Sequence, residues 1–446
     1  MNRAAEPYRR LTEVVHGFAA ARILQVAVEL DVFSKLANEG KTAAQLSTLL
    51  HVHPGALELF LNGLTSLGFL RKEAERFNDT PVSHTYLSKA GPKYLGHLIR
   101  YHAREWEDWG RLEEAIRTGK PVRKPDVYQE SPKELDLFVR GMHELALARG
   151  DARWLTRAIP LRRCRKLLDI GGGPGTYAAM FCRANRNLQA TVLDLPATLK
   201  ITRRVLREFD ITGRVSTMSG NYNDKIKGAP YDVALVSNVL HAEDEATNRR
   251  LLRNAYEALT PGGILIIKDH VMNADHTEPT NGALFALEML LGTPGRTYSF
   301  DEISGWLAKI GYQDTVEVHI DPPANASLVL AARPGKRPLM VLPKPAPARP
   351  AGEMAPGLES AGIANAGDGN GAASAATLEP KSRVARPAAP TALRTRSRRS
   401  ASTARRDPKK KTPGKTAARP GSTRRKASKP AQSQRTAPAA RKSRAR

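Results

Sequence analysis

The chain has little cysteine, no long apolar run, and no aromatic residue in its last quarter. Its 446 residues include only Cys164 and Cys182, too few for a disulfide framework or a cysteine-based metal cluster and in keeping with a reducing cytoplasm. No uninterrupted apolar run of about 18 residues occurs, so we predict no transmembrane helix. Charges at Arg3, Glu6 and Arg9 leave no apolar segment typical of a signal peptide. We therefore expect a cytoplasmic protein with no metal and no membrane contact.

The basic charge lies almost entirely at the C-terminal end. Residues 334–446 hold 27 Lys or Arg and 5 Asp or Glu, whereas residues 1–333 hold 43 and 39, out of a net charge of +26. Such a segment, poor in large apolar side chains, cannot bury enough surface to offset its chain entropy, so we predict a disordered tail. Its basic runs could bind nucleic acid non-specifically through phosphates, and a tail without a partner is an equal alternative.

Residues 8–90 have the pattern of a winged-helix domain. A broad apolar helix face over residues 14–27 precedes a helix that Thr42 is placed to cap, a second helix over residues 54–70 and a hairpin over residues 71–81. A DNA-reading winged helix carries basic and polar side chains on its second helix. That helix has no Lys or Arg here and is rich in leucine, which favours an interaction surface over a base reader.

Residues 91–160 are predicted to form a helical connector. It contains a cluster of aromatic and histidine side chains together with one methionine: Tyr101, His102, Trp106, Trp109, Met142 and His143. Aromatic residues on helices usually pack in a core, and that is the interpretation favoured here. The alternative is that some of them wall a pocket for an aromatic ligand.

Residues 161–333 alternate apolar strands with helical segments, which predicts a Rossmann-like α/β domain with a parallel sheet. The last two apolar segments, residues 315–320 and 327–332, predict a terminal antiparallel pair. The first strand leads into the sequence LLDIGGGPGT over residues 167–176. Glycines are needed where the backbone takes positive φ or where a ligand approaches the main chain. A dinucleotide fingerprint fails here, because Thr176 stands where its last glycine belongs.

An acid follows the next strand, where a doubly wound fold holds the ribose of a bound nucleoside. Asp194 ends the apolar segment 190–195 and lies 19 residues beyond Gly175, close to the expected spacing of about 20 residues. The simpler alternative is that Asp194 caps the next helix, since Pro196 suits a first helical turn. The two roles are compatible.

Together these motifs resemble those of class I S-adenosylmethionine-dependent O-methyltransferases, of the plant caffeate and bacterial polyketide or hydroxyneurosporene type. The resemblance covers residues 10–333 and implies an N-terminal dimerisation domain, a homodimer and a small aromatic or polyketide-like acceptor. It implies that S-adenosylmethionine is bound by residues matching the family's cofactor motifs: Asp169, Gly171, Gly173, Gly175, Asp194, Asn221, Tyr222 and Ser237. It also implies that His241 is the general base and that Asp269 orients its imidazole, a task suited to a group of near-neutral pKa.

Some family positions differ in this chain. Ala242 and Glu243 follow the histidine where the family has a tryptophan, Ser237 replaces a lysine, and a second acid flanking the histidine is missing near Gly295. Phe285, Met289 and residues 296–298 are expected to face the acceptor, although core packing would explain Phe285 and Met289 as well. Because the base machinery differs, transfer to nitrogen, sulfur or carbon by positioning alone stays open. The alternative to an enzyme is a nucleic-acid-binding protein in which the methyltransferase body is a relic or a cofactor sensor.

Overall fold

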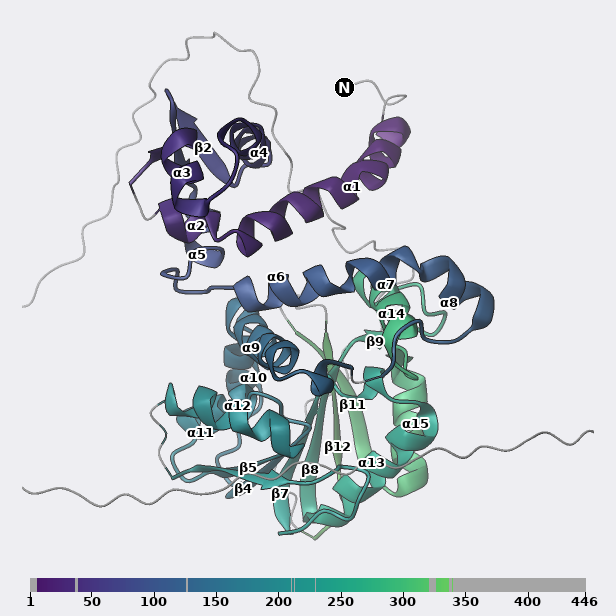
Figure 1. Cartoon of the computed structure of the whole chain (residues 1–446). Coiled ribbons are helices and arrows are strands. Elements are labelled where there is room, and N and C mark those ends of the chain that lie inside the picture. Colours follow the sequence, from purple (N-terminus) through teal and green to yellow (C-terminus); the bar gives the residue numbers. More distant parts are fainter. Residues whose placement is uncertain are drawn as a thin grey trace, which may run out of the picture. The chain divides into compact units, whose positions relative to one another are not determined.

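The computed structural model describes residues 6–36, 39–125, 127–209, 211, 213–228, 230–320, 326–336 and 339. Apart from residues 334–336 and 339, the segment predicted to be a disordered basic tail lies outside the described residues, and so does its proposed contact with nucleic acid. The described elements form an N-terminal helical domain, a helical connector and an α/β domain (Figure 1).

The N-terminal domain packs helices around a small sheet. Its elements are α1 (Glu6–Glu29), α2 (Val32–Leu36), β1 (Lys41–Thr42), α3 (Ala43–Leu50), α4 (Pro54–Ser66), β2 (Leu70–Glu73), β3 (Arg76–Asp79) and α5 (Pro81–Tyr86). The strands pair antiparallel in the order β1-β3-β2. Thr42 caps α3 as predicted: its hydroxyl accepts a hydrogen bond from the Gln45 backbone at 3.2 Å, and the Gln45 side chain accepts one from the Thr42 backbone at 3.0 Å.

The second helix of this domain is shorter than predicted. We expected it over residues 54–70, but α4 ends at Ser66. Gly68 takes a φ of 75°, in the left-handed region, and Leu70 already belongs to β2. A glycine in that conformation ends a helix whatever the hydrophobicity of the residues that follow.

Helix α1 leaves much of its apolar surface exposed. Val14 and Phe18 are 75% and 63% exposed, whereas Ala27 and Val28 near its end are buried. Among the described residues, Pro7–Glu29 is long and apolar enough to cross a membrane, by length and composition only. A single such helix near the N-terminus is weak evidence for a membrane span. The requirement for an uninterrupted apolar run missed it, because charged residues interrupt the segment.

The connector is helical, as predicted. It comprises α6 (Gly96–His102), η2 (Ala103–Glu105), α7 (Trp106–Gly110), α8 (Leu112–Thr118), η3 (Val127–Glu130), α9 (Pro132–Arg149) and α10 (Asp151–Ala158). Tyr101 packs against Phe138 with ring centroids 5.2 Å apart. Trp106 and Trp109 are 40% and 39% exposed, so the expectation that the aromatic group is a core is wrong for these two.

The α/β domain holds a seven-stranded mixed sheet in the order β11-β12-β8-β7-β4-β5-β6. The strands are β4 (Lys166–Ile170), β5 (Gln189–Asp194), β6 (Val215–Ser219), β7 (Tyr231–Ser237), β8 (Leu259–Asp269), β11 (Gln313–His319) and β12 (Ser327–Ala332). Strands β4 to β8 pair in parallel, whereas β12 is antiparallel to both β8 and β11. The predicted parallel sheet with an antiparallel end is confirmed.

Helices cover both faces of this sheet (Figure 1). They are α11 (Thr176–Ala184), α12 (Pro196–Arg207), α13 (Glu245–Ala258) and α15 (Phe300–Ile310). Helix α14 (Thr280–Gly292) lies beside α7 and α8 of the connector, and the short elements are η4 (Leu240–Ala242), β9 (Val271–Met272) and β10 (Tyr298–Ser299). Alternate residues of a strand point to opposite faces. Leu168 of β4 accordingly joins the core with Leu251 of α13 and Trp306 of α15, and Leu167 joins the core with Phe181 of α11. Two buried cores thus fix the sheet edge where the predicted site residues end their strands.

Candidate active site

The glycine-rich turn between β4 and α11 leaves its backbone accessible. Gly171, Gly173 and Gly175 take φ values of 64°, 51° and 73°, a region that side-chain-bearing residues rarely adopt. A Cβ added at Gly173 would meet nothing within 4 Å, whereas one at Gly175 would meet Val192 at 3.2 Å. Gly175 is therefore needed for packing of the turn on the sheet, and Gly173 faces open space where a ligand can approach the main chain.

The two predicted cofactor acids lie at different depths. Asp194 Oδ2 accepts a hydrogen bond from Gly173 N at 2.8 Å, and Oδ1 accepts one from Leu195 N at 2.7 Å. Asp194 is not the N-cap of α12, because Leu195 occupies that position. Asp169 is only 1% exposed, and burial together with the negative charge of Asp194 raises its pKa to about 7. Asp194 thus lies at the rim of the turn, and Asp169 lies beneath it.

Two further predicted cofactor residues lie around the same turn. Ser237 ends β7, which pairs with β4 so that Val236 stands opposite Ile170. The ring of Tyr222 lies 3.8 Å from where a Cβ on Gly171 would be, and its hydroxyl donates a hydrogen bond to a carboxylate oxygen of Glu243. An aromatic ring, an open main chain and a fixed carboxylate suit the adenosine of the cofactor that the resemblance implies.

Asn221, a further predicted cofactor residue, lies in the turn just before Tyr222. Its side chain is exposed, and its Oδ1 accepts a hydrogen bond from Asn223 N at 2.9 Å. It therefore shapes the turn that carries Tyr222.

His241 and Asp269 are brought together, as the predicted base and its partner require. His241 lies in η4 just beyond β7, and Asp269 ends the neighbouring strand β8. Their Nδ1 and Oδ1 atoms are 2.6 Å apart, and the side chains are 12% and 3% exposed. Burial opposes the charged carboxylate, but the charge and hydrogen bond of His241 outweigh it and lower the pKa of Asp269 to about 2.

Backbone amides hold the Asp269 carboxylate in place. Oδ2 accepts a hydrogen bond from Leu240 N at 3.0 Å, and Oδ1 accepts one from His270 N at 2.8 Å. With the carboxylate fixed, the Nδ1–H tautomer of His241 is favoured and Nε2 is the basic nitrogen.

Aromatic rings surround the imidazole on one side. Phe285 of α14 meets the His241 ring edge-on, at 4.7 Å between centroids, and stacks on His270 at 4.2 Å. Burial lowers the pKa of His270 to about 3, so its ring is neutral at pH 7. The expectation that Phe285 faces the reaction site agrees with this geometry. Met289, one turn further along α14, is 6% exposed and packs in the interior.

The loop around Gly295 explains why no acid stands there. A Cβ on Gly295 would lie 2.2 Å from the carbonyl oxygen of His241 and 2.5 Å from Glu243 N. The Tyr298 hydroxyl donates to the Glu243 carbonyl at 2.6 Å, which holds the same stretch of backbone. Arg296, which we expected to face the acceptor, pairs instead with Glu302 at 2.5 Å. Gly295 therefore supports the histidine by close backbone packing.

Sequence reasoning missed several polar residues of this region. The sequence marks Glu243 only as a departure from the family pattern. Its carboxylate accepts a hydrogen bond from Tyr222 and so joins the Tyr222 segment to the His241 segment. Glu288 and Glu105 carried no motif, yet the structure places them near His102. The one available signal was helical spacing, since Glu288 lies three residues beyond Phe285 and on the same side of α14.

Comparison with known proteins agrees with this arrangement. The model of an O-methyltransferase domain matches residues 110–313, and that of an O-methyltransferase dimerisation domain matches residues 12–89. The two matches together span more than half of the chain, and neither gives support to the nucleic-acid alternative.

Two named relatives and one solved structure are O-methyltransferases by name, and a further relative, from Streptomyces rimosus, is named as an N,N-dimethyltransferase and is 27% identical over 73% of this chain and 96% of its own. A 3-hydroxy-5-methyl-1-naphthoate 3-O-methyltransferase of Streptomyces sahachiroi is 29% identical, over 72% of this chain and 94% of its own. The tetracenomycin polyketide synthesis 8-O-methyltransferase of Streptomyces glaucescens is also 29% identical, over 71% and 95%. An O-methyltransferase family protein from Burkholderia thailandensis matches in structure with a TM-score of 0.66 and 26% identity, covering 74% of this chain and 99% of its own. The chain belongs to the S-adenosylmethionine-dependent O-methyltransferases, with a dimerisation domain ahead of the catalytic domain.

Proposed function

We propose that this enzyme methylates a hydroxyl group of a small aromatic or polyketide-like acceptor, with His241 as the general base. The observation that carries the proposal is the 2.6 Å contact of His241 with the fixed carboxylate of Asp269, at the strand ends beside the glycine turn. The two Streptomyces relatives support the acceptor class, since their names specify a hydroxynaphthoate and a polyketide.

The pair His241 and Asp269 favours a hydroxyl over a stronger nucleophile. A neutral hydroxyl must lose its proton as it attacks, and a positioned base contributes about 10²–10⁴-fold to such a step. Nε2 of His241 accepts that proton, and the imidazolium formed is stabilised by Asp269 through Nδ1–H. An amine or thiolate acceptor would need positioning alone, which gives no reason for a buried carboxylate behind the histidine.

The residues of the glycine turn would hold the cofactor. When bound, S-adenosylmethionine supplies an electrophilic methyl group on a sulfonium. Gly173 leaves the main chain open, Asp194 stands at the rim to accept from ribose hydroxyls, and Tyr222 offers a ring for adenine. Phe285 and the buried His270 exclude water from one side of the base.

Calorimetric titration of S-adenosylhomocysteine into the full-length chain tests the cofactor site. We expect a Kd near 1 μM, about −8 kcal/mol. In Gly173→Arg, a bulky side chain enters the open space at a positive φ, so binding is expected to be lost. A folded wild-type protein that binds nothing would contradict the cofactor assignment.

A screen of hydroxylated naphthalenes with S-adenosylmethionine then tests the base. With any acceptor found, His241→Ala is expected to lower kcat by at least ~100-fold while leaving S-adenosylhomocysteine affinity unchanged. Normal turnover by that variant would remove His241 as the base and favour transfer by positioning.

We further propose a cytoplasmic homodimer that associates through the dimerisation domain. The exposed apolar residues of α1 support this, because a monomer rarely leaves such a face uncovered: Tyr8, Leu11, Val14, Val15 and Phe18. Light scattering behind size exclusion should give twice the chain mass. A monomer at micromolar concentration would contradict the proposal.

A further inference from the structure

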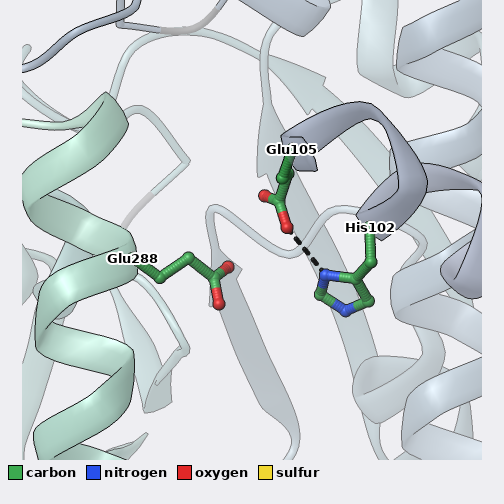
Figure 2. A group of neighbouring side chains, drawn as sticks. All are labelled: His102, Glu105 and Glu288. Atoms are coloured by element: carbon green, nitrogen blue, oxygen red, sulfur yellow. Dashed lines mark hydrogen bonds and ion pairs between the residues drawn. The ribbon is translucent and has the colours of Figure 1, made fainter. Parts of the chain in front are cut away.

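Three polar side chains with no assigned role meet beside the proposed acceptor site. One ligand atom each from His102, Glu105 and Glu288 lies within 4.8 Å of the others. Figure 2 shows the three side chains pointing toward a common space, Glu288 from one helix and the other two from the opposite wall. Glu288 comes from α14, and His102 and Glu105 come from the end of α6 and from η2.

This group lies on the acceptor side of His241. Glu288 follows Phe285 by one helical turn, and the Phe285 ring is 4.7 Å from that of His241. His241 lies close enough for its charge to act on the carboxyl group of Glu288. An acceptor held with its hydroxyl at His241 would therefore extend toward Glu288.

The group has more negative than positive charge. Glu105, 3% exposed, places Oε2 2.8 Å from His102 Nδ1. Its Oε1 accepts no hydrogen bond and lies 3.5 Å from Arg123, which is also 2.9 Å from Asp108. Three carboxylates thus share one guanidinium and one imidazole.

Glu288 is the carboxylate left over. Among the described residues, it makes no hydrogen bond or ion pair at the distances that define one. Burial, and then the negative charge of Glu105, raise the pKa of Glu288 to about 7. The pKa of His102 is raised as well: burial lowers it, but the hydrogen bond with Glu105 outweighs burial. A positive charge or a hydrogen-bond donor brought into this space would relieve both effects.

We propose that His102, Glu105 and Glu288 form an acceptor-recognition site that receives an ammonium group borne next to the methylated hydroxyl and turns away carboxylates. The inference rests on the proposed function, since it needs the acceptor to lie at His241. An ammonium donates hydrogen bonds to carboxylates and pairs with their charge, whereas a carboxylate in this space would face two others of like charge. A divalent metal ion is the other source of positive charge, and the adjacent guanidinium of Arg123 repels a dication more strongly than a monocation.

The test compares acceptors that differ in one substituent. Full-length protein saturated with S-adenosylhomocysteine is titrated, in EDTA, with 2-(aminomethyl)phenol, 2-(hydroxymethyl)phenol and 2-hydroxybenzoate, and with the three corresponding 3-substituted 2-naphthols. The ammonium member of at least one set should bind at least ~10-fold more tightly than the carboxylate member, about 1.4 kcal/mol, with the neutral member between them.

Two variants locate the selectivity. Glu288→Gln removes the charge at constant shape. It should reduce the ratio of the affinity for the ammonium member to that for the carboxylate member by at least about threefold, in line with partial loss of a charge pair. Glu113→Gln, an exposed acid of α8 paired with Arg117, is the matched control and should leave the ratio unchanged. Unchanged affinity for S-adenosylhomocysteine shows that both variants are folded.

Several results would overturn the inference. Carboxylate members that bind as tightly as ammonium members, a ratio unaffected by Glu288→Gln, or no binding by any of the six probes would each do so. Tighter binding of the carboxylate members on adding Mn²⁺ or Zn²⁺ without EDTA would replace it with a metal site. Failure to bind S-adenosylhomocysteine is a separate result, which refutes the proposed function and this inference with it.

Discussion

Replacing Asp269 by asparagine tests the central pair of the site. Asp269 is 2% exposed and accepts hydrogen bonds through both oxygens, from His241 and the His270 backbone on one and from the Leu240 backbone on the other. An amide offers only one oxygen. Whichever way it is turned, its NH₂ group faces an N–H donor, so at least one buried donor loses its partner.

The size of the effect follows from the pKa of this carboxyl. A shift from 3.8 to about 2 is worth about 2 kcal/mol at neutral pH, at about 1.4 kcal/mol per unit. Because the folded-state pKa lies below the unfolded value, this stabilisation is full above about pH 5 and is lost as the pH falls toward 2. An unsatisfied buried donor costs about 1–3 kcal/mol more, so Asp269→Asn should lower the free energy of unfolding by about 3–5 kcal/mol at pH 7.

Urea unfolding at two pH values separates the ionic contribution from simple loss of packing. At pH 3 the wild-type carboxylate has already lost about 1 kcal/mol of its contribution, so the difference between wild type and variant should shrink by that amount relative to pH 7. With an acceptor in hand, kcat should fall by about 10²–10⁴-fold because the histidine is no longer held in one tautomer. Equal stability differences at both pH values, or turnover within tenfold of wild type, would refute the reasoning.

Three shorter predictions concern neighbouring contacts. Gly295→Ala places a Cβ 2.2 Å from the carbonyl oxygen of His241. It should lower kcat more than ~10-fold, as expected of a small displacement of the proposed base. Calorimetry should show unchanged binding of S-adenosylhomocysteine. Lys268→Met leaves the buried carboxylate of Asp151, 3.1 Å away, without its counter-charge, so urea unfolding should show a loss of about 3–5 kcal/mol; a loss under 1 kcal/mol would contradict this. Tyr222→Phe removes one hydrogen bond to a neighbouring carboxylate and should weaken S-adenosylhomocysteine binding only a few-fold, about 1 kcal/mol or less.

The parts of the site carried by strand ends could be predicted from the sequence. The apolar segments leading to Gly171, His241 and Asp269 are short and buried, and parallel strands bring their carboxyl ends to one edge of the sheet. The strand order then places β4, β7 and β8 side by side. Local sequence was sufficient here because the position of each residue relative to the end of its strand decides where it lies.

The residues that come from helices and loops could not be predicted in this way. His102 and Glu288 lie 186 residues apart, and no local pattern indicates that α6 and α14 face each other. The exposure of Trp106 depends equally on how α7 packs. From the sequence, the absence of an acid at Gly295 indicates only that the base lacks a second acid. The backbone distance to His241 shows why the position must stay free of a side chain.

The register of β8 determines whether His241, the proposed base, has Asp269 as its partner. Lys268 and Asp269 are consecutive and both buried, so their side chains point to opposite faces of the sheet. Lys268 pairs with Asp151 of α10 on one side, and Asp269 meets His241 on the other. A slip by one residue would exchange the two charges and set Asp269 against Asp151, two carboxylates without a cation. The ion pair made by Lys268 therefore keeps Asp269 beside His241, because it penalises the arrangement in which the histidine loses its acid.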